Sequence, residues 1–221
     1  MRIGFVVTNL AGGGAEKAVL KIAAALAARG HRSDVILLEN IVSHAVAPEI
    51  RLRAATAAGR PIRKGWLGKR LAAHRLAKLH ALLAREQAFD LLVSTLPFAD
   101  EVARRARLPR HWCRIANTLS AEVARLGAAQ ASKSARRLAR YRRLYDGHRL
   151  IAVSRGVGED LRRELGLARA RIEVELLRKK VKALEPHGLA GVACDQCIAL
   201  DLDLDRALAE GLRNDDVVRG V

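Results

Sequence analysis

Two patterns of hydrophobic and polar positions alternate along the first 174 residues of the chain. Short apolar runs are typical of strands buried in a parallel sheet, and longer stretches with apolar residues at helical spacing are typical of amphipathic helices. The runs predict strands at residues 3–8, 34–38, 50–55, 91–94, 111–115 and 150–153. The longer stretches predict helices at residues 16–29, 67–86, 99–106, 132–145 and 158–165. This alternation predicts an α/β fold, a doubly wound parallel sheet with helices on both faces.

Three consecutive glycines, Gly12, Gly13 and Gly14, lie between the first strand and the first helix. Glycine lets the backbone turn sharply, and the N–H groups at a helix start attract anions. The spacing matches neither G-x-G-x-x-G nor the phosphate loop that ends in Gly-Lys-Ser/Thr. Two interpretations remain open: a phosphate-binding loop, and a tight turn that binds nothing.

Ligands of doubly wound folds bind beyond the carboxyl ends of the strands. Four predicted loops lie there, at residues 9–14, 94–97, 117–120 and 154–156, and they define one candidate cleft. In the last of these loops, Ser154 and Arg155 end a strand and begin a helix, a position that favours anion binding. A plain N-cap by Ser154 explains the same residues equally well.

Several segments, in order and at the expected spacing, resemble the amino-terminal domain of family 4 glycosyltransferases, which have the GT-B fold. The matching segments are residues 1–17, 26–31, 34–38, 89–94, 150–157 and 160–161. The resemblance covers residues 1 to about 174 and implies a Rossmann-like domain, one half of a GT-B fold. It also implies transfer of a sugar from a nucleotide sugar to a lipid-linked or cell-envelope glycan acceptor, with the acceptor bound by this domain.

The resemblance implies that Gly13 and Gly14 approach the diphosphate of the donor, where their N–H groups stabilise the leaving phosphate. Glu16 follows in the first helical turn, where a carboxylate contacts substrate or simply complements the helix dipole. We expect no metal, because this fold does not use the cation site of the other glycosyltransferase architecture. The nucleotide sugar is a substrate, so we expect no cofactor.

Many relatives carry a histidine in the loop after the fifth strand, and this chain has Asn117, Thr118, Ser120 and Glu122 instead. The first three can hydrogen-bond sugar hydroxyls, and Asn117 and Glu122 are the candidates for a catalytic role. In a retaining enzyme, which the resemblance implies, the leaving phosphate can take the proton of the acceptor. The alternative is that Asn117 and Ser120 only turn the chain and cap a helix.

The resemblance ends near residue 174, where it leads us to expect a linker and a second, donor-binding domain with a Glu-x7-Glu motif. Residues 175–221 are too few for such a domain. The pattern predicts one edge strand at residues 198–205 and a short helix at 206–213. We therefore divide the chain into a domain at 1–174 and an atypical tail at 175–221. Whether the chain itself is an active enzyme stays open, and a non-catalytic module that binds an acceptor or a phosphate is the alternative.

Charge adds a further expectation, because the formal net charge is +17 and the basic residues concentrate at 60–85 and 133–149. Basic amphipathic helices bind anionic membrane surfaces. The apolar side of the first segment would consist of Trp66, Leu67, Leu71, Leu76 and Leu79. Nucleic acid is a second interpretation, disfavoured because aromatic residues make up only 3% of the chain. A solvated helix surface is the third.

The three cysteines, Cys113, Cys194 and Cys197, do not form a disulfide framework. Cys194 and Cys197 have the spacing of half a zinc site, but no second Cys or His pair lies at a suitable distance, so we interpret the spacing as incidental. No apolar segment approaches the roughly 20 residues that span a bilayer. We expect a cytoplasmic protein, and a peripheral position on the inner face of the cell membrane is one of the open alternatives.

Overall fold

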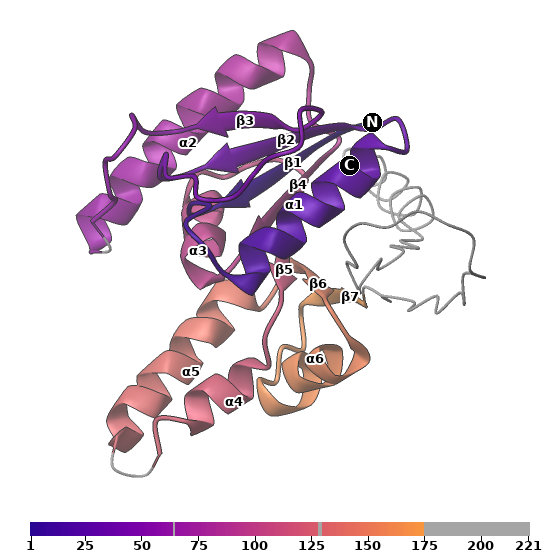
Figure 1. Cartoon of the computed structure of the whole chain (residues 1–221). Helices are drawn as coiled ribbons and strands as arrows, with labels where there is room; N and C mark the ends of the chain where they lie inside the picture. The colour runs from indigo at the N-terminus through magenta and orange to yellow at the C-terminus, as the bar shows by residue number, and fades with distance from the viewer. Residues whose placement is uncertain (64, 128–129, 175–221) are drawn as a thin grey trace, which may run out of the picture.

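The computed structural model of the chain describes residues 1–63, 65–127 and 130–174 (Figure 1). In this part, seven parallel strands form one sheet in the order β3-β2-β1-β4-β5-β6-β7. The strands are β1 (Arg2–Val7), β2 (Arg32–Leu37), β3 (Arg51–Ala54), β4 (Leu91–Thr95), β5 (His111–Ile115), β6 (Arg149–Ala152) and β7 (Arg171–Val174). The order reverses between β1 and β4, which is the switch point where doubly wound folds bind ligands.

Helices cover both faces of this sheet (Figure 1). They are α1 (Gly14–Ala27), α2 (Trp66–Glu86), α3 (Pro97–Arg105), α4 (Leu119–Ala124), α5 (Ala131–Tyr145) and α6 (Arg155–Glu159), and a π-helical turn, η2 (Asp160–Glu164), follows α6. Side chains of a strand alternate between the two faces. Phe5 and Val7 therefore pack with α1, whereas Val6 packs with α2 and α3. The predicted doubly wound parallel sheet is confirmed.

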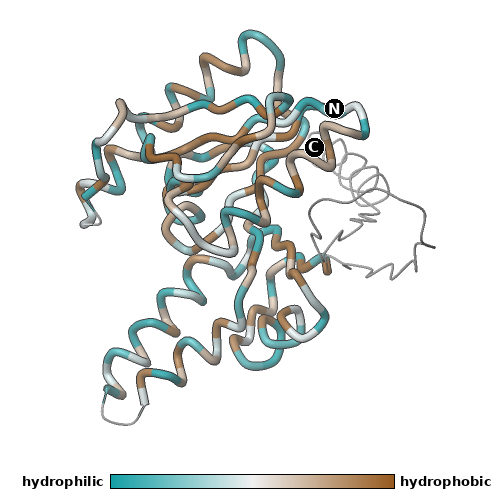
Figure 2. The backbone as a smooth tube through the Cα atoms, in the orientation of Figure 1, coloured by the Kyte–Doolittle hydropathy of each residue, from teal (hydrophilic) through white to brown (hydrophobic). Residues whose placement is uncertain are grey.

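The central strands are buried and predominantly hydrophobic (Figure 2), which is why their apolar runs were visible in the sequence. All six predicted strands and four of the five predicted helices are found, with bounds shifted by at most two residues, and the predicted helix at 158–165 is replaced by α6 and η2. Helix α4 and strand β7 were not predicted from the sequence. The strand and helix predicted at 198–205 and 206–213 lie outside the described residues, as do Cys194 and Cys197.

The apolar side predicted for the second helix was wrong. Leu76 is fully buried and Leu79 is partly buried, and both pack against the sheet. Trp66, Leu67 and Leu71 are exposed instead. The prediction therefore combined residues from two different faces of α2, because the helix carries leucines on its buried and its exposed side.

A buried arginine joins three parts of the chain. Arg2 is 0% exposed, and its Nε donates to Oδ2 of Asp34 in β2 at 2.8 Å. Its Nη1 donates to the carbonyl of Leu83 in α2 at 2.7 Å, and its guanidinium lies 4.0 Å from the centre of the Phe89 ring. A buried charge is tolerated only when it is paired and hydrogen-bonded in this way. Arg2 therefore fixes β1 against β2 and the end of α2.

Candidate functional site

The glycine loop leaves β1 through an Asx turn, in which Oδ1 of Asn9 accepts the N–H of Ala11 at 3.1 Å. Gly12 has φ 127°, a conformation that L side chains rarely adopt. Gly13 has φ 164°, which is ordinary extended backbone, and α1 begins at Gly14. Of these three glycines, only Gly12 is required by the turn itself.

The surroundings of Gly13 and Gly14 differ. A Cβ atom at Gly13 would collide with Oε2 of Glu16, so the Glu16 carboxylate lies over this part of the loop. At Gly14 nothing lies within 4 Å of such an atom. Glu16 thus places a negative charge at the positive end of α1, as the dipole interpretation predicts. The first turn of α1 stays open at Gly14, which is compatible with a ligand close to the backbone.

The segment after β2, which was not predicted as part of the site, braces the glycine loop. Nδ2 of Asn9 donates to Oε2 of Glu39 at 2.7 Å. Backbone hydrogen bonds join Leu10 to Ile41 and to Ser43, each at 2.8 Å. The only available signal was the position of Asn9 and Glu39, two polar residues that follow neighbouring strands at the same edge of the sheet.

A buried polar cluster lies where β4 ends. Ser94, predicted as the last strand residue and the first of the following loop, lies within β4, and its Oγ donates to Oδ1 of Asp100 in α3. The Tyr145 hydroxyl donates to Oδ2 of Asp100 at 2.7 Å, and Nε2 of His111 lies 2.8 Å from Ser94 Oγ. Burial raises the pKa of Asp100 to about 7, against the effect of the two hydrogen bonds. Burial, helped by the charges of nearby cations, lowers the pKa of His111 to about 4.

This cluster holds the turn between β4 and α3. Leu96 lies in that turn with φ 73°, an unusual conformation for a residue with a side chain. Asp100 donates its backbone N–H to the carbonyl of Leu96 at 3.0 Å. Backbone strain of this kind persists only where the surrounding structure enforces it, and it is common at functional sites.

The loop after β5 brings Asn117 and Glu122 together. Nδ2 of Asn117 donates to Oε1 of Glu122 at 3.1 Å, and the Tyr141 hydroxyl donates to Oε2 at 2.7 Å. Burial and the neighbouring Glu122 raise the pKa of Tyr141 to about 12. Both carboxylate oxygens of Glu122 are therefore engaged, and the side chain braces α4 against α5. Asn117 and Thr118 are exposed at the same edge.

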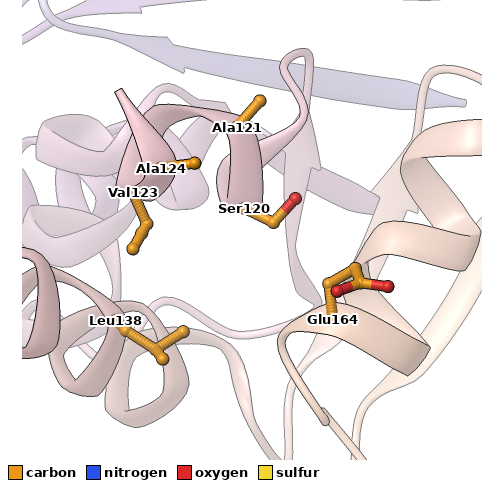
Figure 3. Close-up of a pocket in the computed structure, with 6 residues that line it drawn as sticks. All are labelled: Ser120, Ala121, Val123, Ala124, Leu138 and Glu164. Atoms are coloured by element: carbon orange, nitrogen blue, oxygen red, sulfur yellow. The ribbon is translucent and has the colours of Figure 1, made fainter. Parts of the chain in front are cut away.

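Ser120 lies at the margin of an apolar pocket of about 310 Å³ between α4, α5 and η2. Figure 3 shows the residues that line it, Ser120, Ala121, Val123, Ala124, Leu138 and Glu164. The backbone N–H of Ser120 donates to Oδ2 of the buried Asp160 at 3.3 Å. This contact ties α4 to η2, so it supports a structural role for the start of α4.

Ser154 caps α6, because its Oγ accepts the N–H of Val157 at 3.2 Å. The capping interpretation of this residue is therefore confirmed. Arg155 is exposed beside it. A contact of Ser154 and Arg155 with phosphate stays a prediction.

The predicted loops follow one another along one edge of the sheet. β1, β4, β5 and β6 are neighbours and parallel, so the segments that follow them leave from the same side (Figure 1). This edge brings the N–H groups in the first turn of α1, which has open space beside Gly14, to the same side as the exposed side chains of Asn117 and Thr118. Such groups can hydrogen-bond phosphate oxygens and sugar hydroxyls.

Within residues 1–63, 65–127 and 130–174, no group of three or more His, Cys, Asp or Glu side chains could hold a metal ion. Across the same residues, no helix is both long and apolar enough to cross a bilayer.

Comparison with known proteins identifies the kind of domain to which this sheet and its carboxyl edge belong. The family model of Glycosyltransferase Family 4 matches residues 12–174. No curated protein sequence matches the chain significantly.

Among solved structures, sucrose-phosphate synthase from Thermosynechococcus elongatus superposes with a TM-score of 0.58 at 14% identity, over 79% of this chain and 47% of that one. The apo UGT2 of Phytolacca americana gives a TM-score of 0.49 at 10% identity, over 74% of this chain and 49% of that one. The chain thus spans about half the length of these structures. At this level of identity the likeness shows the fold, which is one half of a GT-B architecture.

Proposed function

Because the chain belongs to glycosyltransferase family 4, we propose that residues 1–174 form the acceptor-binding half of an enzyme that transfers a sugar from a nucleotide sugar. We propose further that the acceptor is a lipid-linked or cell-envelope glycan. The protein would work in the cytoplasm, on the inner face of the cell membrane.

The observation that carries this proposal is the shared edge of β1, β4 and β5. Around it lie the open first turn of α1 at Gly14 and the exposed side chains of Asn117 and Thr118. In the proposed complex, Gly13 and Gly14 face the donor diphosphate, with Ser154 and Arg155 further along the same edge. Asn117, Thr118 and Ser120 bind hydroxyls of the acceptor.

Proton transfer needs no base from this half in the proposed reaction. Both oxygens of Glu122 accept hydrogen bonds, from Asn117 and from Tyr141, so this carboxylate is already engaged within the domain. The leaving phosphate takes the proton of the acceptor hydroxyl, and the N–H groups at the start of α1 stabilise the charge on that phosphate. Glu16 stands close to the same N–H groups and either contacts substrate or moves aside when the donor binds.

The proposal includes a donor-binding half in addition to the described residues. Incubation of the 221-residue chain with a panel of nucleotide sugars and lipid-linked acceptors should therefore give no turnover above background, because positioning of the donor supplies much of the rate enhancement. A fusion of residues 1–174 to a family 4 donor-binding half should restore transfer. Multiple turnovers by the 221-residue chain alone would contradict the requirement for a second half.

In the active fusion, Asn117→Ala and Thr118→Ala should raise KM for the acceptor more than they lower kcat. Lys21→Ala, on an exposed position of α1, is the matched control and should change neither constant. A chain that binds acceptor but gives no active fusion would favour the alternative, a non-catalytic acceptor-binding module.

A further inference from the structure

We propose that the exposed face of α2 is a docking surface for an anionic lipid bilayer. That this bilayer contains the acceptor rests on the proposed function. Docking to the bilayer can be measured without any transfer reaction. The proposed binding partner of this face is the lipid surface itself, without a partner protein or nucleic acid.

Large apolar side chains are exposed along this helix. Leu67 is 70% exposed, Leu71 is 48% exposed and Leu82 is 58% exposed. At 3.6 residues per turn these three leucines fall on one side, opposite the buried Leu76 and Leu83. They are therefore not part of the core, although the sequence pattern alone did not separate the two faces.

Basic side chains lie between the exposed leucines. Arg70, Lys78 and Arg85 are exposed on α2, and His74 is exposed among them. The one acidic residue of the helix is Glu86, at its last position, where Arg32 pairs with it at 3.0 Å. A helix surface that combines exposed leucines with basic residues, and whose one acidic residue is already paired, is complementary to anionic headgroups over an apolar interior.

Trp66 extends this surface at the first residue of α2. It is 59% exposed, and the guanidinium of Arg70 lies 5.8 Å from its ring centre. Tryptophan is one of the two side chains, with tyrosine, that are enriched at the boundary between headgroups and acyl chains. The start of α2 therefore combines an exposed tryptophan with a neighbouring arginine, as is typical of helices that lie at a membrane surface.

The position of α2 relative to the candidate cleft fits a membrane-borne acceptor. Helices that follow parallel strands begin at the edge where the strands end, and α2 follows β3. Figure 1 shows the amino-terminal ends of α2 and α5 on that side of the sheet. Helix α5 also has no acidic residue and carries six exposed basic ones, Lys133, Arg136, Arg137, Arg140, Arg142 and Arg143. It adds electrostatic attraction on the same side as the cleft.

Nucleic acid fits these observations less well. A phosphodiester backbone accounts for the arginines and lysines but leaves Leu67, Leu71 and Leu82 in water. Single strands also require aromatic platforms, and Trp66 is the exposed aromatic residue of α2. Duplex DNA therefore serves as the competing probe in the test.

The test measures binding of the 221-residue chain to phosphatidylcholine vesicles with and without phosphatidylglycerol, by co-sedimentation at several salt concentrations. Binding should require the anionic lipid and weaken as salt rises. The emission of Trp66 should shift to the blue on binding, and Trp112→Phe leaves Trp66 as the sole tryptophan of the chain. Circular dichroism checks that each variant is folded.

Matched variants locate the surface. Lys78→Gln should weaken binding about fivefold, the effect of one basic residue close to an anionic surface. Lys21→Gln removes the same charge from an exposed position of α1, which covers the other face of the sheet, and should leave binding unchanged. The double change Leu67→Ser with Leu71→Ser should weaken binding about tenfold or more.

Equal binding to neutral and anionic vesicles would overturn the proposal, as would an unshifted Trp66 emission. Tighter binding to duplex DNA at the same salt would also overturn it, in favour of nucleic acid. In the active fusion, the double leucine variant should still transfer sugar to a water-soluble acceptor. Loss of that transfer would show that the double change damages the cleft, so its effect on vesicle binding could not be assigned to docking and would contradict the proposed surface.

Discussion

Alanine at Gly12 and alanine at Gly14 should change stability in opposite directions, although the two glycines are only two residues apart. Gly12 has φ 127°, whereas Gly14 is the first residue of α1. The nearest atom to a Cβ at Gly12 is Nε2 of His44 at 4.0 Å, so no collision occurs there. The effect of Gly12→Ala is therefore a measure of backbone conformation alone.

The magnitudes follow from these conformations. A side chain in a sparsely populated backbone region costs about 1–3 kcal/mol, and the reduced entropy of the unfolded chain offsets about 0.4–1 kcal/mol of that. Gly12→Ala should thus lower the free energy of unfolding by about 1–2 kcal/mol. Gly14→Ala meets no atom within 4 Å and lies in a helix, so it should be neutral or raise the free energy of unfolding by up to about 0.5 kcal/mol.

Urea denaturation of the 221-residue chain and its two variants measures these differences directly. In the active fusion, Gly14→Val should abolish transfer while its unfolding midpoint stays close to that of the parent, because the side chain would occupy the space proposed for the diphosphate. Equal losses of stability at Gly12 and Gly14 would refute the assignment of the turn to Gly12. A proportional loss of stability and activity in Gly14→Val would remove the phosphate role of Gly13 and Gly14.

Two further predictions concern buried charges. The pKa of Asp100 is raised to about 7 from an ordinary 3.8, so the folded protein keeps a proton that the unfolded chain has lost, and stability falls as pH rises from about 4 to 7. The pKa of His111 is lowered to about 4 from an ordinary 6.5, so this residue makes the free energy of unfolding rise with pH up to about 6.5. In urea titrations at several pH values, Asp100→Asn should leave the rise that His111 causes, and His111→Gln should leave the fall that Asp100 causes. Profiles that neither variant changes would contradict both pKa shifts. Arg2→Ala should lower the free energy of unfolding by about 3 kcal/mol, because it leaves Asp34 buried with only the more distant Arg32 and Arg53. A loss below about 1 kcal/mol would show that those two arginines suffice.

The fold was predictable because burial and sequence pattern agree in the central strands. β1, β2 and β4 are buried along nearly their whole length, and each contains an apolar run, which in β2 starts only at Val35. β7 escaped detection because two of its four residues are charged, Arg171 and Glu173, at the end of the sheet. Helix α4 has only six residues, which is too short for a clear periodicity.

The site was predictable as a set of loops but not as a set of contacts. The positions of Asn9, Asn117 and Ser154 after strands indicated which edge would bind ligands. The cluster of Ser94, Asp100, His111 and Tyr145 joins residues up to 51 positions apart. No local pattern specifies such a cluster, because it depends on how α3 and α5 pack.

The strand order lets the sheet grow in the direction of synthesis. β1, β2 and β3 lie within the first 54 residues, and β4 then pairs with β1 on its free side. From there each new strand pairs with the one before it, β5 with β4, β6 with β5 and β7 with β6. A nascent chain therefore needs one distant pairing, that of β4 with β1, and afterwards extends a single open edge. Until the next strand arrives, that edge presents unpaired backbone groups, so a chain in which β4 has left the ribosome and β5 has not is prone to aggregate through β4.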